Sequence, residues 1–220
     1  MARWSPIERT LREHDGPLLV GVDEVGRGPL AGPVVACAVV MPPDRRAIPG
    51  VDDSKQLDHA TRVELAARIR AHALVVSLGA ASVREVDRLN IYHATVLAMR
   101  RALARVVHRL GQAPHHVLVD GTPLRTLGTP HTAVVKGDAR CYAIACASIV
   151  AKVTRDRLMT ALAARYDGYA WARNSGYGTP QHRQALAELG LTPHHRRSFC
   201  LDAQVALALD ASSTQDASHE

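Results

Sequence analysis

Aromatic residues are scarce in this chain of 220 residues, which contains one Phe, two Trp and five Tyr. The core must therefore consist mainly of Val, Leu, Ile and Ala, and the few aromatic side chains on a binding surface are easier to single out. The four cysteines (Cys37, Cys141, Cys146 and Cys200) include no CxxC pair. Neither this spacing nor any His cluster indicates zinc, and we expect buried free thiols of a reducing compartment.

Long hydrophobic runs are also missing. The longest apolar run, residues 33–43, is too short to span a bilayer, and the first residues lack the apolar centre of a signal peptide. We therefore expect a cytoplasmic protein with no membrane partner. No segment stands out as an interface between copies, which favours a monomer.

Acidic residues are outnumbered, with 21 Asp and Glu against 27 Lys and Arg, for a net charge of +6. This balance favours polyanionic partners such as nucleic acids, although by itself it is a weak indication. The excess is concentrated between Ala147 and Cys200, where eight Lys or Arg meet only three acids. A basic stretch therefore precedes the acidic last twenty residues.

The hydrophobic pattern predicts one α/β domain with a mixed five-stranded sheet flanked by helices. We assign residues 1–166 to a catalytic core, and the first 15 of these residues form a polar lead-in. Residues 167–210 should form a C-terminal helical segment of the same domain, and residues 211–220 a disordered tail. The first two strands should be antiparallel neighbours. Strands are predicted at residues 18–22, 34–41, 74–78, 116–119 and 132–135, and long helices at residues 58–72, 83–110 and 139–166.

Acidic residues follow the predicted strands. Asp23 and Glu24 come directly after the first strand, Asp120 after the fourth and Asp138 shortly after the fifth. Ligands gather near strand ends in open α/β sheets, so these acids are candidates for one site. Asp138 could instead be only a helix N-cap, and Asp120 only part of a turn.

Convergence of these four carboxylates would require cations. Oxygen ligands suit Mg²⁺ or Mn²⁺ better than Zn²⁺. Two such ions about 4 Å apart would support phosphoryl-transfer chemistry, one activating a water and the other stabilising the leaving oxygen. In a basic chain this arrangement indicates a metal-dependent nuclease.

Several motifs follow one another along the chain. They are GVDEVGRGPLAGPVV (21–35), DDSKQL (52–57), LNIYHATVLAMRRA (89–102), VLVDG (117–121), VVKGDAR (134–140), ASIVAKVTRD (147–156), GYGTPQH (176–182) and HHRRSF (194–199). A lone GRG turn would mean little, but this ordered set is specific. Together the segments resemble ribonuclease HII, the bacterial type 2 ribonuclease H, over roughly residues 17–200.

The resemblance implies a ribonuclease H-like fold with a C-terminal helical segment. It also implies an endonuclease that hydrolyses the RNA strand of RNA–DNA hybrids and incises 5′ to single ribonucleotides in duplex DNA, leaving 3′-hydroxyl and 5′-phosphate ends. Such an enzyme acts in ribonucleotide removal and DNA repair. Its two-metal site would consist of Asp23, Glu24, Asp120 and Asp138.

The same resemblance implies substrate-binding residues. Gly26, Arg27 and Gly28 match a turn that reads the ribose, where glycine allows close backbone approach and the 2′-hydroxyl distinguishes RNA from DNA. Tyr177 matches a tyrosine that packs against the deoxyribose at the RNA–DNA junction, although it could instead be a core residue. Ser54, Lys55 and Lys152 are further nucleic-acid-binding candidates that could contact phosphates or support the metal site, and Lys136 and Arg155 could do likewise. We interpret Asp156 as structural, for example as the partner of an arginine.

Two other hypotheses remain at this stage. A binding module of the same fold would be expected to lack at least one of the four acids, and none is missing. Another two-metal nuclease of related fold would not need both the turn at residues 26–28 and Tyr177. Metal-dependent incision at a single ribonucleotide would separate the three hypotheses.

Overall fold

The computed structural model describes residues 4–200, in which five strands form one sheet in the order β3-β2-β1-β4-β5. β1 pairs antiparallel with β2 and parallel with β4, so the sheet is mixed and the first two strands are antiparallel neighbours, as predicted. The strands are β1 (Leu19–Val25), β2 (Val34–Val40), β3 (Val75–Ala81), β4 (His116–Asp120) and β5 (Thr132–Val134).

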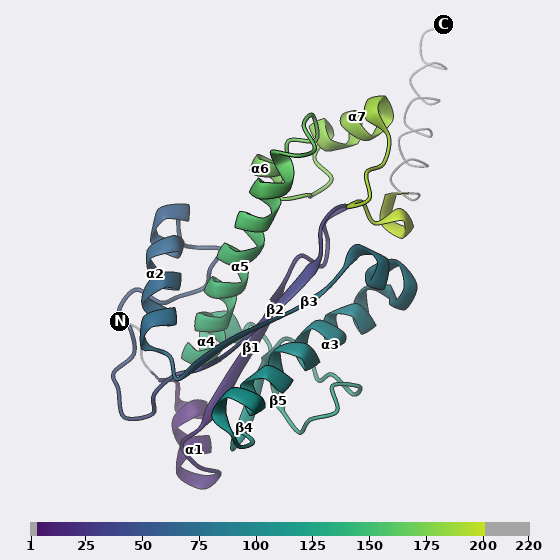
Figure 1. Ribbon diagram of the computed structural model, residues 1–220. Coiled ribbons are helices and arrows are strands. Elements are labelled where there is room, and N and C mark those ends of the chain that lie inside the picture. The colour runs from purple at the N-terminus through teal and green to yellow at the C-terminus, as the bar shows by residue number, and fades with distance from the viewer. Residues whose placement is uncertain (1–3, 201–220) are drawn as a thin grey trace, which may run out of the picture.

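Helices cover both faces of the sheet (Figure 1). Because successive side chains of a strand point to opposite faces, β1 and β2 contribute to two cores. Val20 and Val22 pack with α3 (Val83–Leu110), and Cys37 and Val39 pack with α2 (His59–His72) and α5 (Tyr142–Ala163). The layers are therefore helix, sheet and helix.

Close contact between β1 and α5 sets the distance between the sheet and this helix. A Cβ atom on Gly21 would lie 2.1 Å from the carbonyl carbon of Ala143, so only glycine allows this approach. The first turn of α5 consequently lies directly against the strand that carries Asp23.

The N-terminal residues form a helix that the sequence prediction missed. α1 (Pro6–His14) begins with a capping box between Ser5 and Glu8, with proline in its first turn. The buried Glu8 carboxylate also accepts hydrogen bonds from the backbone N–H groups of Tyr142 and Ala143, at 3.0 and 2.8 Å. Glu8 thus caps the N-terminus of α5 and attaches α1 to it.

The predicted long helix from residue 139 to 166 is wrong at its start. A short helix α4 (Gly137–Arg140) is separated from α5 by Cys141, whose backbone is extended (φ −127°, ψ 124°). Asp138 therefore lies inside α4 rather than capping the long helix. β1 also differs from the prediction, because it continues through Asp23 and Glu24 to Val25.

The predicted helix over residues 83–110 is confirmed, with its Ser82–Glu85 capping box. The unexpected feature is a kink at Asn90, whose backbone (φ 66°, ψ 169°) is not helical. The Asn90 side chain accepts a hydrogen bond from the N–H of His93 at 3.1 Å and so caps the second part of the helix.

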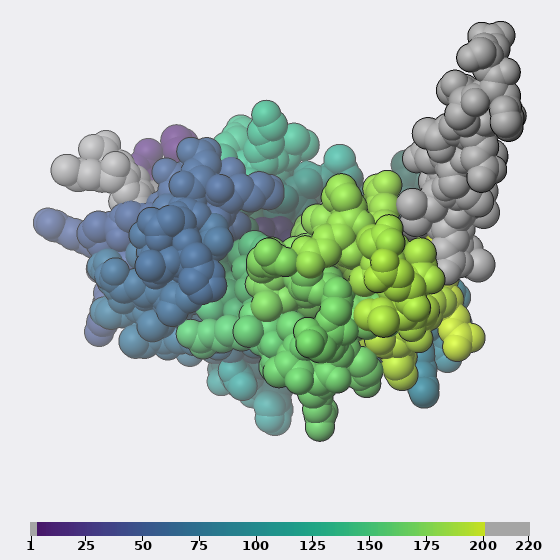
Figure 2. All heavy atoms as spheres, turned by 90° about the horizontal axis from the view of Figure 1, so that it is seen from above, coloured from purple at the N-terminus to yellow at the C-terminus, as the bar shows by residue number. Residues whose placement is uncertain are grey.

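Residues 167–200 contain α6 (Trp171–Asn174) and α7 (Pro180–Leu189), as the expected short helices. Trp171, Tyr169 and Leu186 share a small core with Leu30 and Ala31 from the β1–β2 connection. In Figure 2 this green-to-yellow segment lies on the same face as the blue residues around α2. The predictions for residues 201–210 and for the tail at 211–220 lie outside the described part.

All four cysteines are buried and free, as predicted. Of the helices in residues 4–200, none is both long and apolar enough to cross a membrane.

Candidate active site

Asp23 and Asp120 lie side by side on two parallel strands. Val22 pairs with Val119 in the β1–β4 register, so the acids that follow them are direct neighbours. Adjacent strands are about 4.8 Å apart. By alternation along the strands, both acids point to the face that α5 covers.

Asp138 joins this pair from α4. The Asp120 carboxylate accepts a hydrogen bond from the backbone N–H of Gly137 at 2.6 Å, which fixes the start of α4 against the end of β4. Asp138 is the next residue and is buried. With Glu24 adjacent to Asp23, the structure thus brings all four predicted acids to one edge of the sheet.

Crowding and burial destabilise the ionised forms of these acids. Burial, followed by the charges of Glu24 and Asp120, raises the pKa of Asp23 well above its usual value. Burial also raises the pKa of Glu24, against the opposing effect of Arg27. The pKa of Asp120 is raised by burial and by the Asp138 charge. The site therefore has a deficit of positive charge.

Two side-chain cations partly offset this deficit. Lys55 Nζ lies 3.1 Å from Asp138 Oδ2, and Arg27 Nη1 lies 3.2 Å from Glu24 Oε1. The hydrogen bond to Asp138 raises the pKa of Lys55. Both basic side chains are largely exposed, so solvent weakens these pairs and each can move away from its acid.

The donor set fits divalent ions, although the side chains are not arranged around one. Within residues 4–200, no group of three or more His, Cys, Asp or Glu side chains is positioned to hold a metal ion. Asp138 and Glu24 contact Lys55 and Arg27 instead. Carboxylate oxygens are nevertheless the ligands that Mg²⁺ and Mn²⁺ prefer, and such an ion would stabilise the ionised forms of these acids.

Ser54 lies behind the carboxylates rather than on the surface. Its side chain is buried, and its Oγ is 2.9 Å from Ser148 Oγ. A hydrogen bond from Ser148 lowers the pKa of Asp23. Of the two roles considered for Ser54, support of the site agrees better with this position than contact with a phosphate.

The turn Gly26–Gly28 follows β1 and faces solvent at Gly28. Gly26 has φ +87°, and a Cβ atom there would lie 2.1 Å from Arg155 Nε. A Cβ atom on Gly28 would lie 3.6 Å from Tyr177 Cε1, with no closer neighbour. Gly28 and Tyr177 are therefore neighbours at the surface, and Arg27 of the same turn contacts Glu24.

Tyr177 is 46% exposed, so the alternative that it is a core residue is wrong. Its loop is joined to the β1–β2 connection by the backbone N–H groups of Leu30 and Ala31, which both donate to the carbonyl of Gly176. The one aromatic side chain among the predicted site residues is thus held next to the turn.

Two fully buried arginines, Arg155 and Arg196, organise this region. Arg155 donates to the carbonyl oxygens of Pro33, Ala31 and Ser175 at 2.8–3.0 Å. The suggestion that Arg155 contacts phosphate is therefore wrong, because its guanidinium faces inward. The burial of Arg155 could have been predicted from its position, because Ala151, Arg155 and Met159 are spaced four residues apart and lie on the buried side of α5.

No role was predicted for Arg196 from the sequence. It donates to the carbonyls of Gly26, Arg27 and Gly32 at 2.5–3.0 Å. Burial, reinforced by the charge of Arg155, lowers the pKa of Arg196 to about 10. Its partners lie some 170 residues earlier in the chain, so no local pattern could identify them.

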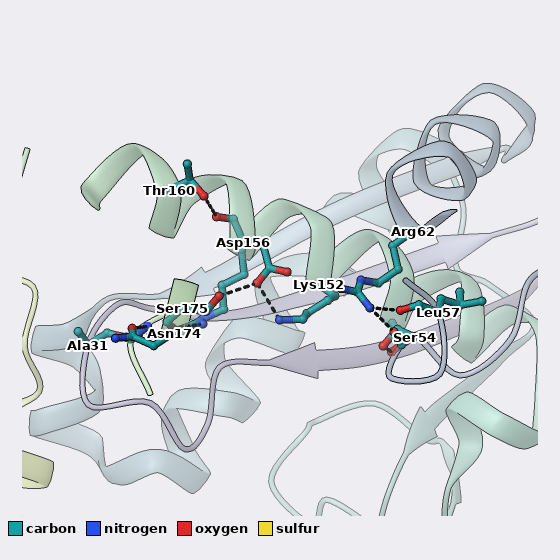
Figure 3. A network of polar contacts seen from close by, with 12 residues as sticks. Ala31, Ser54, Leu57, Arg62, Lys152, Asp156, Thr160, Asn174 and Ser175 are labelled. Carbon is teal, nitrogen blue, oxygen red and sulfur yellow. Dashed lines mark hydrogen bonds and ion pairs between the residues drawn. The ribbon is translucent and has the colours of Figure 1, made fainter. Parts of the chain in front are cut away.

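Lys152 and Asp156 form an ion pair at 2.8 Å on α5 (Figure 3). The Asp156 carboxylate also accepts a hydrogen bond from Ser175 Oγ at 3.1 Å. The ion pair of Asp156 is thus with a lysine and not with an arginine, and its structural role stays a prediction. Binding of nucleic acid by Lys152 stays a prediction.

Comparison with known proteins finds similar sequences over most of this chain. The family model described as Ribonuclease HII matches residues 20–202. Ribonuclease HII of Thermosynechococcus vestitus (strain NIES-2133 / IAM M-273 / BP-1) is 55% identical over 183 residues, which are 82% of this chain and 83% of that protein.

Solved structures support the fold. Ribonuclease H2 from Pyrococcus horikoshii OT3 is similar, with a TM-score of 0.69, 27% identity, and coverage of 82% of this chain and 93% of that one. Bst-RNase HIII in complex with Mn²⁺ has a TM-score of 0.66 and 19% identity, covering 90% of this chain and 72% of its own. The expected ribonuclease H-like fold is confirmed.

Proposed function

Because the chain belongs to the ribonuclease HII family, and is thus a ribonuclease H that cleaves RNA in RNA–DNA hybrids, we propose that Asp23, Glu24, Asp120 and Asp138 hold two divalent metal ions for this cleavage. The observation that carries the proposal is the convergence of these acids from β1, β4 and α4. When bound, such ions activate a water and stabilise the leaving oxygen.

The residues of the chain contribute position and charge. Asp23 is close enough to Glu24 and Asp120 for their charges to raise its pKa, so these three acids would hold metal ions together. Lys55 pairs with Asp138 and Arg27 pairs with Glu24 in this structure; if metal ions took the place of these pairs, both exposed basic side chains would be able to turn toward a phosphate. This exchange would place positive charge beside the scissile phosphate.

We further propose that the enzyme incises 5′ to single ribonucleotides in duplex DNA, leaving 3′-hydroxyl and 5′-phosphate ends. The support is that the exposed Gly28 and Tyr177 are neighbours and that Arg27, in the same turn, contacts Glu24. Glycine at position 28 lets backbone approach a ribose, and the exposed ring of Tyr177 offers a flat face to the next sugar, where a 2′-hydroxyl would crowd it.

Duplex DNA with one ribonucleotide tests both proposals. We expect the wild type to nick 5′ to the ribonucleotide with Mg²⁺ or Mn²⁺, and EDTA to abolish the nick. Asp120→Asn should keep fold and hybrid binding but lose cleavage by about 100-fold or more, because a metal ligand is weakened. Asp44→Asn, on an exposed loop, is the matched control.

Wild-type turnover by Asp120→Asn would remove Asp120 from the site. Cleavage that persists in EDTA would contradict the metal proposal. Cleavage of long hybrids without any nick at a single ribonucleotide would contradict only the second proposal.

A further inference from the structure

Two buried imidazoles lie in contact behind the Tyr177 loop. His182 is 0% exposed and His195 is 2% exposed, and their Nε2 atoms are 3.0 Å apart. At this distance one Nε2 must carry a hydrogen and the other a free lone pair. The surrounding groups determine which is which.

The state of His182 follows from the Tyr177 backbone. His182 Nδ1 is 2.9 Å from the carbonyl oxygen of Tyr177, which can only accept, so Nδ1 must carry the hydrogen. In the neutral ring Nε2 is then an acceptor. Its single lone pair is shared by the indole N–H of Trp171 at 3.1 Å and the Nε2–H of His195 at 3.0 Å.

The state of His195 agrees with this assignment. Its Nδ1 lies 2.9 Å from the backbone nitrogen of Thr192, which donates to it, and 3.0 Å from the Thr192 hydroxyl. All four ring nitrogens are thus satisfied when both histidines are neutral. Burial lowers the pKa of both, that of His195 to about 4, which agrees with a neutral pair.

The pair connects Tyr177 with the turn Gly26–Gly28, the two parts that we propose to contact the sugars. His182 holds the carbonyl of Tyr177, while His195 forms a backbone bridge with Ala31 in the β1–β2 connection. The next residue, Arg196, holds the carbonyls of the turn Gly26–Gly28. A change in the contact between the two rings would therefore alter the spacing between Gly28 and Tyr177.

We propose that His182 and His195 are positioning residues for cleavage at a ribonucleotide–deoxyribonucleotide junction, because they fix the Tyr177 ring relative to the turn. The inference rests on the proposed role of Tyr177. It assigns neither histidine to the chemistry, since neither contacts the carboxylates, and it concerns the choice of substrate rather than the rate on every substrate.

Two substitutions at one position test this role. In side-chain length, an Asn amide reaches the place of Nδ1, and a Gln amide reaches the place of Nε2. His182→Asn can still donate to the Tyr177 carbonyl, whereas His182→Gln cannot. The measured quantity is kcat/KM at a single ribonucleotide divided by kcat/KM on an all-RNA strand paired with DNA.

We expect His182→Asn to keep this ratio within about twofold and His182→Gln to lower it about three- to tenfold, the effect of one hydrogen bond. With Tyr177→Ala present, neither change should lower the ratio further. Equal ratios for the two variants, or a loss that persists with Tyr177→Ala, would overturn the proposal. Absence of wild-type incision at a single ribonucleotide would instead refute the proposed function.

A measurement on the unmodified protein covers the case in which a variant does not fold. Nitrogen-15 NMR of the imidazoles should show the Nδ1–H tautomer for His182 and the Nε2–H tautomer for His195. An Nε2–H tautomer at His182 would mean that it does not hold the Tyr177 carbonyl, and the proposal would fail.

Discussion

Gly26 and Gly28 differ in how strongly the fold requires glycine at their positions. Gly26 has a positive φ and no room for a Cβ atom beside Arg155, so the fold itself requires glycine there. Gly28 lacks a positive φ, and a Cβ atom would meet Tyr177 only at ordinary contact distance. Neither the backbone conformation nor packing within the chain therefore requires glycine at position 28.

Gly28→Ala should therefore separate stability from activity. We expect its free energy of unfolding to stay within about 0.5 kcal/mol of wild type, while cleavage of hybrids falls about tenfold or more because the methyl group lies where we propose that the sugar binds. Gly26→Ala is the matched control and should lose about 2 kcal/mol or more of stability. Urea unfolding and hybrid cleavage measure the two effects, and wild-type cleavage by Gly28→Ala would contradict the reading of the turn.

Among the elements, the sheet and the helices with strong periodicity were predictable from the sequence, and the junctions were not. Residues 139–166 read as one helix because Ala and other helix formers continue across the break. The extended backbone at Cys141 depends on contacts of α4 with Asp120 and of α5 with Glu8, which are distant in sequence. α1 was missed although its Ser5–Glu8 capping box is a local signal.

The histidine pair between α7 and the segment that follows it gives a prediction about pH. The pKa of His195 is lowered in the folded state, so the unfolded chain binds the proton more readily as pH falls below about 6.5. The contribution of His195 to stability should be complete above that pH and decline toward pH 4.

Between pH 7.5 and 5.5 the wild type should consequently lose about 1 kcal/mol more stability than His195→Gln, which cannot titrate there. Urea unfolding at both pH values measures the difference. His59→Gln, at an exposed position, should behave as wild type. If His195→Gln loses as much stability as wild type, His195 is not a neutral buried group.

For the whole molecule, the position of the four acids at one edge of the sheet could be predicted because each lies in or shortly after the last residues of an apolar strand. The attachment of residues 167–200 could not. The basic stretch after Ala147 contributes to the positive charge that favours a polyanionic partner, yet Arg155 and Arg196 face inward and bind backbone carbonyls. Whether an arginine is exposed or buried depends on the tertiary packing around it, which a count of charges does not include.

Arg196→Lys tests how this segment is held. An ammonium group cannot replace the several directed bonds of a guanidinium, so we expect a loss of about 2–4 kcal/mol. Hydrogen exchange should become faster in the turn Gly26–Gly28 and around Tyr177. Arg197→Lys, at the neighbouring exposed position, should leave both unchanged. Equal exchange in the two variants would show that Arg196 does not join the parts.

The bonds from Arg196 also decide which way the peptide groups of the turn face. The carbonyls of Gly26 and Arg27 point inward to the guanidinium. Because the C=O and N–H of a trans peptide are opposed, the N–H groups of Arg27 and Gly28 point outward. The buried guanidinium of Arg196 thus orients two backbone N–H groups of the turn toward solvent, where the oxygen atoms of a ribose could accept hydrogen bonds from them.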